Sequence, residues 1–169
     1  MSPVHLHLVL NHLPAIGVLF AGALFVVALF MRSAPFQRVA LWFLVLSALA
    51  AVPVYLTGES AEEAVEHLPG VAETLIERHE EAAGVTFTTM EVLGGVALLA
   101  ALIFRKAREV PRVVAAGLVA LVVATSGLFT WTGYLGGQIR HAEIRSDTAL
   151  ADAGGAGEDG SGGEDRDDD

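Results

Sequence analysis

Four long apolar runs divide the chain, and short polar connections separate them. Each run reaches the ~20 residues that a helix needs to cross ~30 Å of hydrocarbon. Within the runs the apolar residues are continuous rather than periodic, which is typical of helices that contact lipid. The pattern predicts an all-α, four-helix transmembrane bundle of two hairpins. We place its spans at about 9–31, 39–57, 84–104 and 113–137.

Charge in the connections predicts how the bundle is oriented. The connections 32–38 and 105–112 hold six of the ten basic residues, whereas the link 59–83 holds eight Glu and one Arg. Short loops rich in Lys and Arg stay on the cytoplasmic side of bacterial membranes. We therefore expect both termini and the acidic link on the extracytoplasmic side.

The acidic link is expected to form short amphipathic helices on the outer face. Ser60 and Glu63 have the spacing of a capping box, which predicts a helix start. Leu68-Pro69-Gly70 breaks that helix, and a second helix is expected to run on into the third span. Residues 1–145 then form the membrane domain. The tail 152–169 is rich in Gly and acidic residues, has no large apolar side chain, and is expected to be disordered.

Composition narrows the possible functions. The chain is 53% apolar, its formal charge is −10, and it has no cysteine. The negative charge argues against nucleic acid as a partner, and the lack of cysteine excludes disulfides and thiolate metal sites. Nine Arg against one Lys, with abundant Ala and Gly, indicate a GC-rich bacterium and its cytoplasmic (inner) membrane. The expected partners are the lipid bilayer and other membrane or respiratory proteins.

Three histidines are candidate ligands at the outer end of the bundle. His12 opens the first span, His79 lies on the apolar face of the helix that leads into the third, and His141 ends the fourth. Gly133 and Gly137 precede His141 on the same helical face, which leaves room for a porphyrin, although glycine is also frequent in membrane helices generally. A b-type haem takes two neutral imidazoles from facing helices. A divalent metal would accept the same imidazoles.

Glu91 is the one acidic residue deep within a span. Intramembrane carboxylates are costly and indicate function. The alternative is a protonated side chain that hydrogen-bonds to a hydroxyl across the bundle, from Thr88, Thr125, Ser126 or Thr130.

Small residues and a faint repeat add to the picture. The series Ala116, Ala120 and Ala124 has the spacing that allows close helix contact. Leu56-Thr57-Gly58 ends the second span and Trp131-Thr132-Gly133 ends the fourth, with His12 and His79 as the corresponding histidines at the start of each hairpin.

These short motifs carry a family resemblance. His7 to Pro14 reads H-x4-H-L-P, and Thr57-Gly58, His79, Thr132-Gly133, Gly136-Gly137 and His141 follow in order. In this pattern, over about residues 5–145, the chain resembles the DUF2231 family of small four-span bacterial membrane proteins. The resemblance implies the fold and no settled activity.

Three functions remain open from the sequence. One is an accessory or structural membrane component, the second is a b-type haem protein for redox or sensing, and the third is a periplasm-facing metal-binding protein. No residue is assigned a catalytic role, so an enzyme is not expected.

Overall fold

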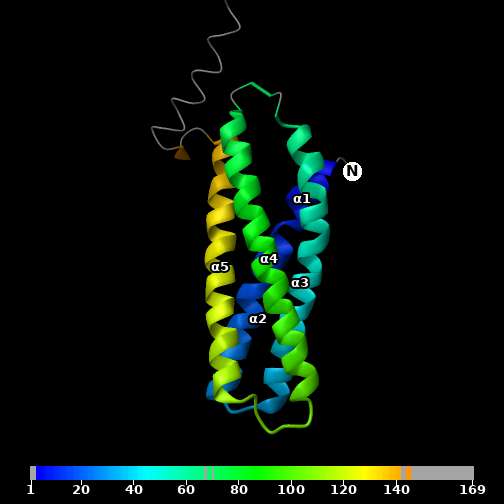
Figure 1. The fold of residues 1–169 in the computed structure, drawn as a ribbon, viewed down its shortest axis with the longest axis vertical. Coiled ribbons are helices and arrows are strands. Elements are labelled where there is room, and N and C mark those ends of the chain that lie inside the picture. Colours follow the sequence, from blue (N-terminus) through cyan, green and yellow to red (C-terminus); the bar gives the residue numbers. More distant parts are fainter. Residues whose placement is uncertain (1–2, 67, 70, 142–143, 146–169) are drawn as a thin grey trace, which may run out of the picture.

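The computed structural model describes residues 3–66, 68–69, 71–141 and 144–145, and within these residues the chain is helical, with no strand. The helices are α1 (Pro3–Leu10), α2 (His12–Phe30), α3 (Ala34–Glu63), α4 (Glu73–Ile103) and α5 (Arg112–Arg140). With α1 and α2 counted together as Val4–Phe30, four helices are long and apolar enough to cross a membrane. The predicted all-α architecture with four such helices is confirmed (Figure 1). The predicted acidic tail lies outside the described residues.

The first apolar run is divided at Asn11, between α1 and α2. Pro14 has no backbone N–H to donate to the Leu10 carbonyl, and its ring crowds that carbonyl. Asn11 keeps helical backbone angles (φ −59°, ψ −25°), and its N–H donates to the His7 carbonyl at 2.9 Å. The two pieces take different neighbours, since α1 packs against α3 while α2 packs against both α3 and α5.

The link between α3 and α4 differs from the prediction. α3 continues through Gly58 and Ser60 to Glu63, so the prediction of a separate amphipathic helix that starts at Ser60 was wrong. The residues after Gly58 are mostly Glu and Ala, which extend an existing helix more easily than they nucleate a new one. α4 begins at Glu73 and runs unbroken to Ile103, as predicted for the helix that leads into the third span.

Glycines allow close helix contacts inside the bundle. A Cβ atom on Gly94 would collide with Ala48 of α3, and one on Gly22 would collide with Val122 of α5. The core around these contacts consists of fully buried apolar side chains, namely Val18, Phe25, Leu41, Leu44, Met90, Leu93 and Leu118. Dense packing of this kind holds helices together where lipid supplies no hydrophobic drive for their association.

The series Ala116, Ala120 and Ala124 does not form the contact that its spacing predicted. All three residues are exposed, and α5 turns Ala115, Leu118 and Thr125 inward instead. The fourth span is apolar on every side, so the sequence pattern does not distinguish its inner face. Large apolar side chains are also exposed along the long helices, for example Phe20, Leu46, Leu99 and Val123.

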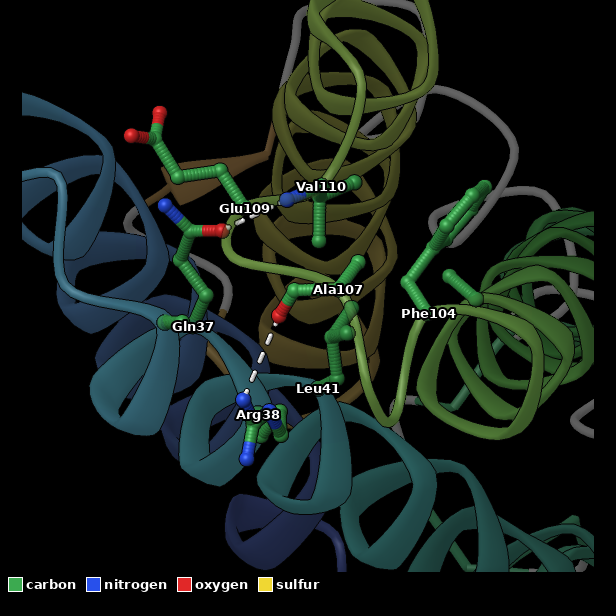
Figure 2. A pocket seen from close by; sticks show the side chains of 9 residues that line it. Gln37, Arg38, Leu41, Phe104, Ala107, Glu109 and Val110 are labelled. Carbon is green, nitrogen blue, oxygen red and sulfur yellow. Dashed lines mark hydrogen bonds between the residues drawn. The ribbon is translucent and has the colours of Figure 1, made fainter.

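One end of the bundle, which we call the basic end, contains the connections 31–33 and 104–111 and the first turns of α3 and α5. Gln37 of α3 is buried there and joins three segments (Figure 2). Its Oε1 accepts the Val110 N–H at 2.9 Å, and its Nε2 donates to the Ala28 carbonyl at 3.4 Å. The side chain thereby fixes the end of α2, the start of α3 and the approach to α5.

Two arginines tie the same connections together. Arg38 donates from Nη2 to the Ala107 carbonyl at 3.3 Å, and Arg32 pairs with Glu109 at 3.1 Å. Arg32 has a positive φ of 53°, the left-handed conformation that ends many helices. Both basic connections therefore lie at one end of the bundle, as the predicted topology requires.

Candidate functional site

The opposite end, which we call the histidine end, contains α1, the end of α3, the start of α4 and the end of α5 (Figure 1). Two half-buried imidazoles there contact neighbouring helices, and they come from His7 and His79. Each is held through its Nδ1 atom by a backbone carbonyl of another helix. This shared arrangement makes the histidine end the candidate site.

His7 of α1 is held by α3. Its Nδ1 lies 3.1 Å from the Val54 carbonyl oxygen and 3.3 Å from Thr57 Oγ1. A carbonyl oxygen can only accept a hydrogen bond, so the neutral ring carries its proton on Nδ1. The Nε2 atom then holds a free lone pair.

His79 of α4 is held in the same way by α5. Its Nδ1 lies 3.0 Å from the Thr132 carbonyl oxygen, which again assigns the proton to Nδ1. The Thr86 and Thr132 hydroxyls share a hydrogen bond of 2.7 Å beside this contact. Gly136 makes room for the ring, because a Cβ there would lie 2.9 Å from His79 Cε1.

The two imidazoles also face similar surroundings. Each ring lies near a Thr-Gly pair, Thr57-Gly58 in one case and Thr132-Gly133 in the other. A Cβ on Gly58 would lie 3.8 Å from His7 Cε1. The faint repeat seen in the sequence therefore pairs His79 with His7, where we had paired it with His12.

The structure distributes the three predicted histidines over different environments. His79 packs against α5, as its position on the apolar face predicted. His12 is exposed, and its Nδ1 contacts the Leu8 carbonyl one turn earlier at 3.2 Å. His141 is exposed and caps α5, where its backbone N–H donates to the Gly137 carbonyl at 3.0 Å. The convergence of all three on one site stays a prediction.

The two glycines chosen with His141 have different neighbours. A Cβ on Gly133 would meet no atom within 4 Å, so this face of α5 is open. A Cβ on Gly137 would lie 3.1 Å from Ile144 Cδ1, so Gly137 makes room for the segment that follows α5. Gly136, which the sequence analysis passed over, is the glycine that contacts a histidine.

Glu91 does not make any of the four hydroxyl contacts that we considered. Its Oε1 is buried without a hydrogen-bond partner among the described residues, as are Thr125 Oγ1 and Ser126 Oγ. The Thr88 and Thr130 hydroxyls donate instead to carbonyls of their own helices, Gly84 and Ser126. A buried polar atom without a partner is costly, so each of these three side chains carries a cost inside the bundle.

A metal centre made of protein ligands alone needs more donors than the site offers. Over the part of the chain that the structure describes, no three His, Cys, Asp or Glu side chains are grouped to hold an ion. Structural and catalytic zinc sites use three or four such ligands. The described residues of the histidine end thus offer two oriented imidazoles, those of His7 and His79.

Four further residues belong to this site although the sequence pattern did not single them out as ligands or contacts, namely His7, Thr57, Thr132 and Gly136. The signal was present, because H-x4-H and the two Thr-Gly pairs were all visible. What was missing was which of the two histidines in H-x4-H faces α3. Comparison with known proteins adds no assignment, since no family model, no curated protein and no solved structure matches the chain.

Proposed function

We propose that this protein is a multi-pass component of the bacterial cytoplasmic membrane with an accessory or structural role and with both termini on the extracytoplasmic side. The observation that carries the proposal is the set of four membrane-length helices whose outward surfaces are rich in large apolar side chains. Such surfaces suit lipid and not water. The resemblance to the DUF2231 family, through His7 to Pro14 and the Thr-Gly pairs, supports the same fold.

The orientation rests on charge. Arg32 and Arg38 contact the connection between α4 and α5, so both basic connections gather at one end. Positive connections of this length remain in the cytoplasm. The histidine end is then extracytoplasmic, and the expected partners are lipid and other membrane or respiratory proteins.

Reporter fusions test this topology. Fusions after Arg38 and after Lys106 should report the cytoplasm, and a fusion at the C-terminus should report the periplasm. A fusion after Glu66, in the acidic link, is the matched control and should also report the periplasm. A cytoplasmic C-terminus would refute the number of spans or their orientation.

A second function is favoured by one observation, and it is binding of a b-type haem at the histidine end. In both His7 and His79 the Nδ1 atom donates to a backbone carbonyl, so in the neutral form of each ring Nε2 is the lone-pair donor. Imidazoles that ligate a metal are oriented in this way, by a hydrogen bond from the other nitrogen to a carbonyl. A haem supplies four nitrogen ligands of its own, so two protein imidazoles complete its iron, whereas a bare divalent ion needs more.

When bound, the haem would supply one-electron redox chemistry, with a potential set by its axial ligands and surroundings. The chain would hold the imidazoles in place and present them at a partly apolar end of the bundle. The test is a visible spectrum of the detergent-purified full chain, expressed with excess haem precursor. A Soret band at one haem per chain is expected, and a colourless, folded protein would reject this candidate.

A further inference from the structure

We propose that His7 and His79 are the axial pair for a b-type haem at the histidine end. This assignment rests on the haem-binding function proposed above and differs from the set His12, His79 and His141 that the sequence favoured. The geometry of the two side chains carries it, because these two imidazoles are each held on a neighbouring helix through Nδ1.

First, both Nε2 atoms lack a hydrogen-bond partner among the described residues. The two contacts from Nδ1 to carbonyl oxygens, 3.1 Å for His7 and 3.0 Å for His79, lie within the range for N–H···O hydrogen bonds. A ligand at Nε2 would therefore meet a ring whose tautomer is already fixed.

The second step is that both rings belong to the same end of the bundle. His7 lies on α1 and His79 on the second turn of α4, and these two segments meet at that end. The holding helices differ, α3 for His7 and α5 for His79. A planar ligand bound between the rings would thus join the α1–α3 side of the bundle to the α4–α5 side.

The third step concerns space for a flat ligand. Gly136 lies directly beneath the His79 ring, and Gly58 lies beside the His7 ring. Gly133, one turn from Gly136 on α5, has no atom within 4 Å of a built Cβ. The His79 ring itself covers Gly136, whereas Gly133 leaves backbone surface uncovered, and a macrocycle with apolar edges could lie against that surface.

His12 and His141 fit the role less well. The Nδ1 of His12 contacts its own helix at Leu8 and the ring is exposed, so no second helix orients it. His141 is exposed at the C-terminal cap of α5. These two residues serve as matched controls, since they are the same residue type at the same end of the protein.

Binding is coordination without electron transfer. Ferric haem would lose its two weak axial ligands, water or a detergent-phase anion, and gain two bonds from imidazole Nε2 lone pairs. No proton leaves either ring, because Nε2 is unprotonated in the neutral tautomer. The expected product is six-coordinate, low-spin ferric haem.

The experiment is a titration of the detergent-purified full chain with hemin, followed by visible and electron paramagnetic resonance spectra. The wild-type chain should bind one hemin with a low-spin spectrum. His7→Ala and His79→Ala should each lose that spectrum and bind hemin at least about tenfold more weakly, since even the outer partners of a ligand contribute 10–100-fold. His12→Ala and His141→Ala should behave as wild type.

Two further measurements separate loss of a ligand from loss of fold. Far-ultraviolet circular dichroism and size exclusion should match wild type for every variant, and added imidazole should restore the low-spin spectrum of His7→Ala and His79→Ala. A low-spin spectrum that persists in His7→Ala, or that disappears in His12→Ala or His141→Ala, would overturn the assignment while haem binding stands. If the folded wild-type chain binds no hemin, the haem function itself fails.

Discussion

Replacement of Gln37 by Met tests whether the basic end is held by a buried polar side chain. Gln37 is 1% exposed, and its amide bridges the end of α2 and the approach to α5. Methionine has nearly the same length and volume and forms neither hydrogen bond. The substitution therefore removes the polar contacts and leaves the packing almost unchanged.

The magnitude follows from the two bonds, which are unequal. The Val110 N–H donates to Gln37 Oε1 at 2.9 Å, and after the substitution it would be buried without an acceptor, at about 1–3 kcal/mol. The Ala28 carbonyl is less affected, because the 3.4 Å bond to it is long and because it also accepts the Ser33 N–H at 3.0 Å. We expect a loss of about 2 kcal/mol in the free energy of unfolding.

Thermal unfolding in detergent, followed by circular dichroism, measures this loss. For a domain of this size 2 kcal/mol corresponds to a Tm lower by about 4–8 °C. Leu41→Met is the control, since Leu41 is fully buried one turn further along α3 and an apolar swap of this kind costs less than about 1.5 kcal/mol. If Gln37→Met lowers Tm no more than Leu41→Met does, the bridge contributes nothing to stability and the reasoning is wrong.

Two further substitutions test packing and charge. Gly94→Ala should destabilise the bundle by about 1–3 kcal/mol, because the new Cβ atom would collide with Ala48. Gly95→Ala is the control and should leave the Tm nearly unchanged, because a Cβ there meets no atom within 4 Å. Equal effects of the two substitutions would contradict the close approach of α3 and α4. Glu62→Gln should raise the Tm at neutral pH, because burial and the repulsion of Glu80, Glu66, Glu59 and Glu63 both disfavour the charged carboxylate. High salt should remove only the part of that gain that comes from repulsion, and acid pH, where the carboxylates are neutral, should remove all of it. A gain that persists at acid pH would show another cause.

The sequence predicted the helices well because membrane thickness sets a length that apolar runs must meet. It predicted their inner faces poorly. Every face of the fourth span is apolar, so nothing in the sequence marked Ala116, Ala120 and Ala124 as exposed. Ser60 shows the complementary problem, since a local capping signal has no effect where the preceding helix simply continues.

The site was predicted in part, and the reason is geometric. His79 follows the buried residues Leu75 and Ile76 at helical spacing, which indicated its inward direction correctly. His7 and His12 lie on one short segment that Pro14 divides from the rest of the run. Either His7 or His12 could have been the histidine that contacts α3, and the outcome depends on how α1 packs before that break. Residue spacing along a single helix does not determine this packing.

The bridge at Gln37 gives the two ends of the bundle different stiffness. At the basic end, one amide and two arginines join neighbouring connections to one another. At the histidine end, His7 joins α1 to α3, while His79 and the hydrogen bond between Thr86 and Thr132 join α4 to α5. We therefore expect the basic end to be the more rigid end of the bundle, and the two helix pairs to separate more easily at the histidine end. Amide hydrogen exchange should be faster at the histidine end than at the basic end. A ligand that contacts both the α1–α3 pair and the α4–α5 pair should slow that exchange.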